Sequence, residues 1–477
     1  MKLSEIAMEL AGTKLTGDAD IGGLCADSRV AGEGDLFFCF QGTKTDAHNY
    51  AAEAVARGAA AVLCEREISV SCPQLIVEDA REGMARACAA FCGHPERAMR
   101  MVGVTGTNGK TTTAAMIANI LNEAGVAAGV IGTLGAVYGN VHVPPSLTTP
   151  DPVCLYPLLQ EMAEAGMKAV VMEVSAHALA LKKEAPIFFD VAVFTNLSQD
   201  HLDFFGSMQA YAAAKKRLFT RQKCACAVLN ADDAFGRSLE GEAPETITYG
   251  LETPADAFAV VESDTLRGCK AVLNVHDELC EATIALTGRH NLSNALAAAC
   301  AAKRLGAHAD AVARGLGKTH VDGRLEWTAK YHGADIFVDF AHTPDGLEKS
   351  LCALREHCAG RLIVVFGCGG NRDADKREKM GAVAARCADL SVITSDNPRY
   401  EDPCSIIAAI EAGHRACSRE YVVMEERERA IAYAVGLLAE GDVLLVAGKG
   451  GETYQEIMGI KYDYNDKAVI EKLVGKS

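Results

Sequence analysis

The stretch 102–112, Val-Gly-Val-Thr-Gly-Thr-Asn-Gly-Lys-Thr-Thr, contains the residue types that a phosphate-binding loop requires. The apolar run before it predicts a buried strand over 99–104, and the run after it predicts a helix over 113–124. Glycines allow backbone N–H groups to surround phosphate oxygens, while Lys110 can reach the terminal phosphates and Thr111 can bind Mg²⁺. The longer pattern G-x-x-x-x-G-K-[ST] fails, because Val104 occupies its first glycine position. The alternative is an ordinary glycine-rich turn before a helix.

Two predicted strands end on groups that could assist this loop. Glu173 ends one apolar run, and His201 follows another beside acidic neighbours. The carboxyl ends of parallel strands line the ligand crevice of an open α/β sheet, and a carboxylate there can hold Mg²⁺. The alternatives are a salt-bridged glutamate and a structural histidine. The helix predicted over 208–219 carries adjacent cations, and its spacing does not distinguish Lys215 from Lys216 or from a solvated basic face.

The composition excludes several classes of protein. With 477 residues the chain is too long for one core, and roughly two to four domains are expected. A net charge of −16 at pH 7 disfavours binding to nucleic acid or to an anionic membrane. The 18 cysteines form no C-x-x-C pair, which indicates reduced thiols in a cytoplasmic protein and argues against zinc. The sequence predicts no signal peptide and no membrane span, because it lacks an uncharged apolar stretch of about 18 residues.

The pattern of elements predicts an α/β protein of three domains. Residues 1–98 form the first, which ends near a Gly-His-Pro break at 93–95. Residues 99–321 alternate strand and helix, which indicates a parallel sheet covered by helices around the phosphate loop. Residues 322–477 form a second Rossmann-like unit. Three separate cores are expected.

Motifs spread over nearly the whole chain resemble the Mur ligase superfamily. They comprise the phosphate loop, the Glu173 strand, Tyr211-x-x-x-Lys215, His290-Asn291-x-x-Asn294, Asp322-Gly323-Arg324 and the segments 196–203, 339–344, 367–373 and 396–399. This combination is highly specific, whereas the phosphate loop alone would not be. The resemblance implies an N-terminal UDP-binding domain, a central ATPase-like domain and a C-terminal domain that binds an amino acid.

The resemblance implies an ATP-dependent amide ligase of peptidoglycan precursor biosynthesis. ATP would convert the terminal carboxylate of UDP-MurNAc-L-Ala-D-Glu to an acyl phosphate, and the amine of meso-diaminopimelate would displace phosphate. The enzyme is expected to be a cytoplasmic monomer whose domains close around the substrates.

Three alternatives stay open: the same reaction with L-lysine, a folylpolyglutamate synthase-like ligase, and a non-catalytic nucleotide-binding regulator. The N-terminal domain argues against the second alternative, because that ligase usually begins close to its phosphate loop. The intact set of Lys110, Glu173, His201 and Lys215 argues against the third.

The resemblance also assigns roles at the ATP site. Lys110, Glu173, His201 and Lys215 match catalytic residues of the family. One Mg²⁺ would be bound by Thr111 and Glu173, and a second by His201 and by Lys215 carrying a carbamate derived from CO₂. The implied ATP-binding set is Gly106, Thr107, Asn108, Gly109, Lys110, Thr111, Thr112, Asn291, Arg324, Asp339 and His342.

Two further sets match the family's contacts to its other substrates. The set for UDP-MurNAc-dipeptide is Ser28, Thr43, Lys44, Thr45, Thr148, Thr149, Ser175 and Lys183. The set for meso-diaminopimelate is Arg372, Asp396, Asn397, Pro398, Arg399, Gly448 and Glu452. Arg399 is expected to select diaminopimelate over L-lysine, because a guanidinium can bind the second carboxylate bidentately. The chain departs from the usual motifs at Ala47, Leu181, Lys183, Phe205 and Gly451.

Overall fold

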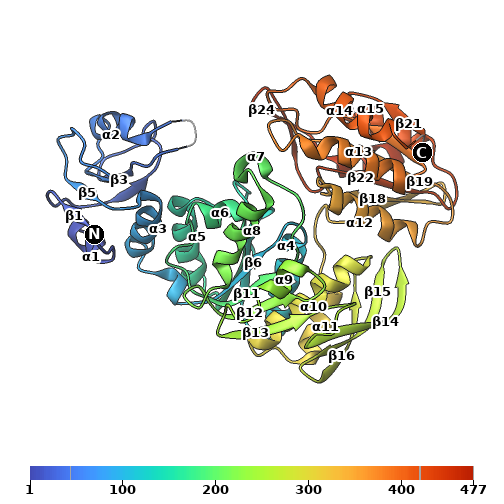
Figure 1. Cartoon of the computed structure of the whole chain (residues 1–477), viewed down its shortest axis with the longest axis horizontal. Coiled ribbons are helices and arrows are strands. Elements are labelled where there is room, and N and C mark those ends of the chain that lie inside the picture. Colours follow the sequence, from blue (N-terminus) through green and yellow to red (C-terminus); the bar gives the residue numbers. More distant parts are fainter. Residues whose placement is uncertain (43–44, 418–419, 476–477) are drawn as a thin grey trace.

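The computed structural model describes residues 1–42, 45–417 and 420–475, and its three large sheets follow one another along the chain. The N-terminal and C-terminal sheets lie at opposite sides of the molecule, with the largest sheet between them (Figure 1). Helices pack against the sheets, which confirms the predicted α/β class. Within the described ranges, no helix is long and apolar enough to span a membrane.

The N-terminal sheet has five strands in the order β1-β5-β4-β3-β2. β1 runs antiparallel to β5, and the remaining neighbours are parallel. The strands are β1 Lys14–Leu15, β2 Gly23–Cys25, β3 Asp35–Phe38, β4 Ala61–Cys64 and β5 Gln74–Ile76. The helices are α1 Leu3–Met8, α2 Ala51–Ala56 and α3 Ala80–Phe91. The sequence also predicts a helix over 47–57, and the structure divides this segment into a 3₁₀ turn, Ala47–Tyr50, and α2.

The central sheet has eleven strands. Its middle is parallel, as predicted, but its two edges are antiparallel, which the alternation of strand and helix did not predict. Its order is β16-β15-β14-β13-β12-β11-β6-β10-β7-β8-β9, and antiparallel strands close both edges. The parallel strands are β6 Arg100–Thr105, β7 Ala128–Gly132, β10 Ala169–Glu173, β11 Phe189–Phe194, β12 Cys224–Asn230 and β13 Glu245–Tyr249. The edge strands are β8 Gly135–Tyr138, β9 Val141–Val143, β14 Ala257–Thr265, β15 Gly268–Val275 and β16 Glu278–Ile284. The sequence also predicts a late strand over 283–287, but only residues 283 and 284 lie in a strand, at the end of the antiparallel β16.

The central helices connect these strands and carry several of the predicted site residues. They are α4 Lys110–Glu123, α5 Pro152–Glu164, α6 Ala176–Ala180, α7 Leu202–Phe205, α8 Met208–Lys216, α9 Ala234–Ser238, α10 Arg289–Arg304 and α11 Ala309–Gly317. α4 begins at Lys110, three residues earlier than predicted, so the lysine stands in the first turn of the helix. α10 is buried along most of its length, because its run of alanines fits closely against the sheet.

The C-terminal sheet has six strands in the order β17-β18-β22-β19-β20-β21, and all neighbours but β17 and β18 are parallel. The strands are β17 Glu326–Tyr331, β18 Ala334–Asp339, β19 Leu362–Phe366, β20 Leu390–Ile393, β21 Glu420–Val423 and β22 Val443–Ala447. The helices are α12 Pro344–Arg355, α13 Asp375–Cys387, α14 Pro403–Arg415, α15 Arg427–Gly436 and α16 Asp466–Val474. A separate hairpin, β23 Tyr454–Ile457 and β24 Ile460–Asp463, follows the sheet.

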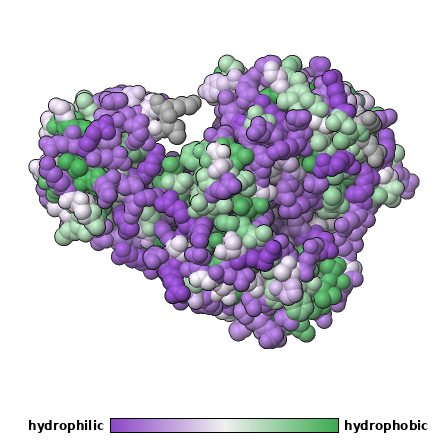
Figure 2. Space-filling model, in the orientation of Figure 1, coloured by the Kyte–Doolittle hydropathy of each residue, from purple (hydrophilic) through white to green (hydrophobic). Residues whose placement is uncertain are grey.

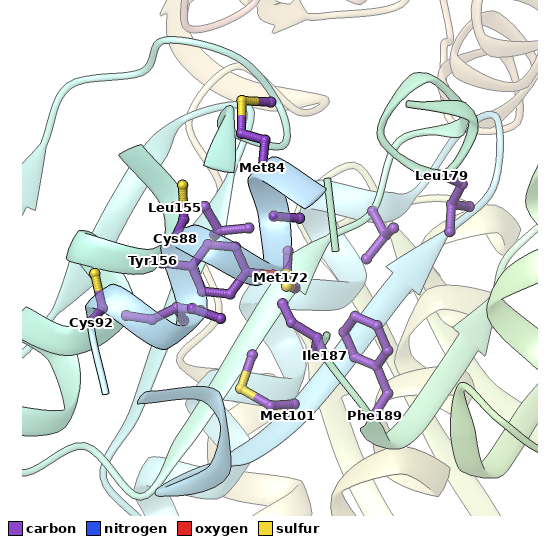
Figure 3. Packing of buried hydrophobic residues seen from close by; sticks show 14 of the residues in the cluster. Met84, Cys88, Cys92, Met101, Leu155, Tyr156, Met172, Leu179, Ile187 and Phe189 are labelled. Carbon is purple, nitrogen blue, oxygen red and sulfur yellow. The ribbon is translucent and has the colours of Figure 1, made fainter. Parts of the chain in front are cut away.

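The N-terminal and central units share one hydrophobic core, in contrast to the three separate cores expected. Met84 and Cys88 of α3 belong to the same buried cluster as Tyr156 of α5 and Met172 of β10 (Figure 3). α3 is buried on several sides. Its alanine and glycine residues are small, so both the N-terminal sheet and α5 can pack closely against it. The C-terminal unit has clusters of its own around β19 and β22.

The hairpin β14–β15 reaches from the central unit to the C-terminal unit. Leu266 at its turn packs against the C-terminal core. The Arg267 guanidinium lies 3.5 Å from the ring centre of Trp327 and 3.2 Å from a carboxylate oxygen of Asp335. The surface in Figure 2 is mostly hydrophilic, with hydrophobic residues gathered in small patches. The hairpin thus adds a direct contact between the central and C-terminal units.

Candidate active site

The phosphate loop joins β6 to α4, as predicted. Lys110 Nζ donates hydrogen bonds to the carbonyl oxygens of Gly106 at 3.0 Å and Thr107 at 2.8 Å. Gly109 has a φ of 85°, and a Cβ there would lie 2.5 Å from the side-chain oxygen of Asn294, so the tight turn requires glycine. Burial lowers the pKa of Lys110, although the nearby carboxylate of Glu173 partly opposes this shift.

Glu173 ends β10 beside this loop and is almost fully buried. Its Oε1 accepts a hydrogen bond from the Thr133 amide at 2.8 Å, and its Oε2 accepts one from the Thr133 hydroxyl at 3.1 Å. A Cβ at Gly132 would lie 2.1 Å from Oε1, so the glycine makes room for the carboxylate. The Thr111 hydroxyl accepts a hydrogen bond from Arg324 Nη2 at 2.9 Å.

Lys215 is 1% exposed and lies behind the phosphate loop. Its Nζ donates to the Gly106 carbonyl at 2.8 Å and lies 4.5 Å from the ring centre of Tyr211. Burial lowers the pKa of Lys215 well below its ordinary value, and the charge of Lys110 adds to the shift. Lys216, by contrast, has a side chain that is 46% exposed. The structure therefore distinguishes the two lysines that spacing left equivalent.

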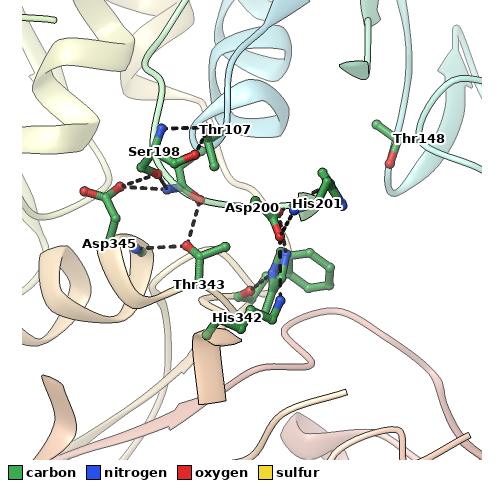
Figure 4. Close-up of polar contacts among 12 residues, drawn as sticks. Thr107, Thr148, Ser198, Asp200, His201, His342, Thr343 and Asp345 are labelled. Carbon is green, nitrogen blue, oxygen red and sulfur yellow. Dashed lines mark hydrogen bonds and ion pairs between the residues drawn. The ribbon is translucent and has the colours of Figure 1, made fainter. Parts of the chain in front are cut away.

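Asp200, which was not among the predicted site residues, lies at the centre of a polar cluster. Its carboxylate oxygens lie 3.3 Å from His201 Nε2 and 3.9 Å from His342 Nε2 (Figure 4). The Lys376 Nζ lies 3.8 Å from the same carboxylate. Burial is the largest influence on Asp200 and opposes its ionisation, but the charge of Lys376 and the other polar neighbours, including the His201 amide, together lower the pKa of this carboxyl. Burial lowers the pKa of His201 to about 3 and that of His342 to about 4, so both imidazoles are neutral at pH 7.

A second cluster joins the phosphate loop directly to the C-terminal unit. Asn108 Nδ2 donates to Asp345 Oδ2 at 2.7 Å, and the Ser198 hydroxyl donates to the same oxygen at 3.4 Å (Figure 4). The Thr343 hydroxyl caps α12 and donates to Asn108 Oδ1 at 3.4 Å. These contacts bring α12 against the loop.

Arg324 and Asp339 complete this side of the site. Arg324 lies just before β17, and Asp339 is the last residue of β18. The Arg324 guanidinium lies 4.3 Å from the Phe340 ring centre, and burial lowers its pKa. Asp339 Oδ1 accepts hydrogen bonds from the amides of Leu325 at 3.1 Å and Phe340 at 2.8 Å. Burial raises the pKa of Asp339. Asn291, at the start of α10, donates from its side chain to the Thr287 carbonyl at 2.8 Å.

The segment 396–399 meets the loop after β22 at the other end of the site. Asn397 Nδ2 donates to Glu452 Oε2 at 2.9 Å, and buried Lys449 donates to both side chains at 2.9 Å. Asp396 Oδ2 is buried without a hydrogen-bond partner among the described residues. A Cβ at Gly448 would lie 2.5 Å from that oxygen, so this position requires glycine. Lys449 was absent from the predicted sets.

One pocket of about 630 Å³ joins the two ends of the site. It is lined by these predicted residues: Thr107, Asn108, Gly109, Lys110, Thr111, Thr112, Thr148, Glu173, His201, Asn291, Arg324, Asp339, His342, Arg372, Asp396, Asn397, Arg399, Gly448 and Glu452. The predicted residues outside its lining are Ser28, Thr45, Gly106, Thr149, Ser175, Lys183, Lys215 and Pro398. Thr43 and Lys44 lie outside the described residues. The structure thus brings most residues of the predicted ATP-binding and diaminopimelate-binding sets together around one pocket.

Family profiles match three successive parts of the sequence. The Mur ligase family catalytic domain matches residues 20–101, the Mur ligase middle domain 104–302 and the Mur ligase glutamate ligase domain 323–450. A Caldanaerobacter subterraneus subsp. tengcongensis protein named UDP-N-acetylmuramoyl-L-alanyl-D-glutamate–2,6-diaminopimelate ligase is 40% identical over 463 residues, 96% of either chain. The chain belongs to the Mur ligase family.

Other Mur ligases agree with this assignment. A Geobacillus kaustophilus protein of the same name is 41% identical over 467 residues, again 96% of either chain. A solved structure of a ligase of that name is 31% identical, covers 96% of this chain and 95% of its own, and has a TM-score of 0.67. The family resemblance and the fold predicted from the motifs are therefore confirmed.

Three of the residues that match the family's contacts to UDP-MurNAc-dipeptide lie around the end of β10 in this Mur ligase. The Thr149 hydroxyl donates to the Glu173 carbonyl at 2.8 Å and accepts from the Ser175 amide at 3.0 Å. Lys183 Nζ donates to the Thr149 carbonyl at 3.2 Å and lies 2.7 Å from Asp151 Oδ1. Lys183 is therefore already neutralised by a carboxylate. Ser28 lies apart from this group and donates to Glu53 in the N-terminal unit.

The donor set around Glu173 suits Mg²⁺ bound together with a nucleotide. Mg²⁺ in such sites takes one or two protein oxygens, and phosphates and water supply the remaining ligands. Thr111 and Glu173 offer such oxygens at the pocket wall. Among the described residues, the groups of three that could hold an ion are Asp264–Glu356–His357 and His320–Asp322–Glu326, and neither contains Glu173. The oxygens present therefore fit a metal that arrives with phosphate.

Proposed function

We propose that this chain is the ATP-dependent ligase that joins meso-diaminopimelate to UDP-MurNAc-L-Ala-D-Glu in peptidoglycan precursor biosynthesis. The observation that carries the proposal is the pocket that joins the phosphate loop to Arg399, Arg372 and Glu452. The names of relatives about 40% identical over nearly the whole chain support it.

The phosphate-loop end of the pocket would activate the substrate carboxylate. A carboxylate oxygen attacks the γ-phosphorus of ATP, ADP leaves, and the resulting acyl phosphate is attacked by the amine, which expels phosphate. Lys110 and Arg324 would neutralise charge on the transferred phosphoryl group, while the loop amides hold the other phosphates. Asn291, Asp339 and His342 would contact the nucleotide.

Thr111 and Glu173 would hold one Mg²⁺, and His201 with a carbamylated Lys215 would hold a second. When bound, Mg²⁺ neutralises phosphate charge. The lowered pKa of Lys215 favours its neutral amine, which is the form that reacts with CO₂. The proposal is supported by the contact of Lys215 Nζ with the Gly106 carbonyl, because a carbamate on this nitrogen would then lie close to the phosphate loop.

The opposite end of the pocket would select the amino acid. Arg399 would bind the distal carboxylate of diaminopimelate, and Arg372 supplies a second cation that has no partner among the described residues. Asp396, Asn397, Pro398, Gly448 and Glu452 would surround the distal amino acid centre. Asp396 brings a buried oxygen that has no hydrogen-bond partner in the part of the chain that the structure describes, and an ammonium group could supply one.

The nucleotide sugar would bind across the N-terminal unit. Ser28, Thr43, Lys44 and Thr45 would contact UDP, and the group around Thr149 would contact the muramoyl-dipeptide. We divide the chain into domains at 1–98, 99–321 and 322–477. We further propose that the enzyme acts as a monomer in the cytoplasm.

An ADP-release assay tests the proposal. The purified chain is given ATP and Mg²⁺, with and without UDP-MurNAc-L-Ala-D-Glu, and with a panel of amino acids. We expect ADP only when the UDP substrate and diaminopimelate are both present. Release with folate and glutamate would favour the folylpolyglutamate alternative, and binding without release under any condition would favour a regulator.

A further inference from the structure

We propose that Glu456 is a positioning residue that fixes the Arg399 guanidinium for the carboxylate at the far end of the incoming amino acid. This inference rests on the proposed function, which gives Arg399 that ligand. Glu456 lies on β23, outside the pocket lining, and belongs to none of the predicted sets. Its role would be to act through Arg399, without touching the substrate.

Two acceptors from different segments fix the plane of the guanidinium. Arg399 Nε donates to Glu456 Oε2 at 3.2 Å, and Nη1 donates to the Gly370 carbonyl at 2.8 Å. A Cβ at Gly369 would lie 2.9 Å from Nη1, so the loop can approach this closely only with glycine. Among the described residues, no acceptor meets Nη2. The end of the guanidinium therefore keeps free N–H groups that can bind a carboxylate bidentately.

The backbone of β23 holds Arg399 independently of the Glu456 side chain. The Arg399 amide donates to the Glu456 carbonyl at 3.0 Å, and the Arg399 carbonyl accepts from the Met458 amide at 2.6 Å. The Glu456 amide donates to Asn397 Oδ1 at 2.9 Å. Because β23 and its turn contribute only backbone atoms of residues 456 and 458 to these bonds, the bonds remain when the Glu456 side chain is replaced. Removing the carboxylate should free the guanidinium while leaving the hairpin in place.

The geometry also argues against the opposite role, in which Glu456 competes with the substrate for Arg399. A competitor would occupy the end of the guanidinium, whereas Glu456 bonds to Nε and leaves Nη2 open. The two roles predict opposite changes in the affinity for the amino acid when the Glu456 carboxylate is removed. Loss of a positioning residue weakens amino acid binding because the arginine is no longer preorganised, and loss of a competitor strengthens it.

Steady-state kinetics of E456A and E456Q test this inference. E456A should raise KM for diaminopimelate about 10-fold or more, as expected for a misplaced binding group, with little change in kcat or in KM for ATP and the UDP substrate. E456Q should recover most of the loss, because its amide oxygen can still accept from Nε. The matched control is E428A, which removes an exposed ion pair with Lys472. This control should behave like the unaltered enzyme.

A double-mutant cycle with Arg399→Ala separates positioning from a general effect. If Glu456 acts through Arg399, E456A should have no further effect in the R399A background. An unchanged or lower KM for diaminopimelate in E456A, equal damage in E456Q, additivity with R399A, or loss of the folded state would each overturn the inference. Failure of the unaltered enzyme to use diaminopimelate would instead overturn the proposed function.

Discussion

At the scale of single residues, burial decides which of two adjacent lysines can serve chemistry. Lys215 is buried and its pKa is lowered by that burial, whereas Lys216 is exposed and pairs with Glu242. The sequence predicted the residues at strand ends, because Glu173 and His201 each follow an apolar run. It could not predict the contacts of Asp345, because its partner Asn108 is 237 residues away.

Replacement of Lys215 by alanine should abolish most ligase activity. We expect a fall of at least about 100-fold, because the variant lacks the side chain whose carbamate is proposed to bind the second Mg²⁺. Short carboxylates added to the assay should restore part of it. Lys216→Ala is the matched control and should retain activity, since that side chain pairs only at the surface. Full turnover by the Lys215 variant would refute the role.

Replacement of Arg399 by alanine should damage the use of diaminopimelate selectively. The loss in kcat/KM is expected to be about 2–5 kcal/mol, as for breaking a buried charge pair. Competition between diaminopimelate and L-lysine measures the selectivity. Arg415→Ala, which removes an ion pair with Glu411 and a hydrogen bond to the Tyr421 hydroxyl, both far from the predicted site residues in the sequence, serves as control. Equal kcat/KM values for the Arg399 variant and the unaltered enzyme would contradict the assignment.

At the scale of elements, periodicity predicted the fully buried parallel strands and missed nearly all of the antiparallel edges. β10 is buried at every position, so its sequence is a continuous apolar run. β14 carries Glu262, Ser263 and Asp264 within its exposed half, which hides its strand character. These edge hairpins matter, because the turn that holds Leu266 packs against the C-terminal core.

Buried His414 of α14 should make the C-terminal unit sensitive to acid. Both of its ring nitrogens lack partners among the described residues, and burial lowers its pKa from the ordinary value of 6.5. Because the pKa is lowered in the folded state, the contribution of neutral His414 to the free energy of unfolding is fully present above pH 6.5. This contribution is lost as the pH falls below 6.5. When the pH is lowered from about 7.5 to about 5.5, the Tm of His414→Phe should therefore fall less than the Tm of the unaltered chain.

Thermal unfolding at several pH values measures this difference. His142→Gln, a change at an exposed histidine, should leave the pH dependence of Tm as it is in the unaltered chain. An equal loss of Tm on acidification in the His414 variant and the unaltered chain would show that His414 does not contribute.

At the scale of the whole molecule, the shared core restricts which unit can move. Because α3 and α5 pack in one cluster, the N-terminal and central units are expected to move little against each other. The C-terminal unit has its own core and meets the central unit through polar contacts and the β14–β15 hairpin. Domain closure should therefore be a movement of the C-terminal unit.

Solution scattering should detect this movement. An ATP analogue together with UDP-MurNAc-L-Ala-D-Glu should lower the radius of gyration, because both ligands draw the units around the pocket. Either ligand alone should have a smaller effect. A radius that stays the same with both ligands bound would count against closure.

The most direct test of the account is to identify the product formed when two amino acids compete. The enzyme is incubated with ATP, Mg²⁺, UDP-MurNAc-L-Ala-D-Glu and equal amounts of meso-diaminopimelate and L-lysine, and the UDP-linked product is weighed by mass spectrometry. The account predicts a product that carries diaminopimelate, formed together with ADP and phosphate, and almost none that carries lysine. A lysine product in comparable amount, or no ATP-dependent product at all, would contradict it.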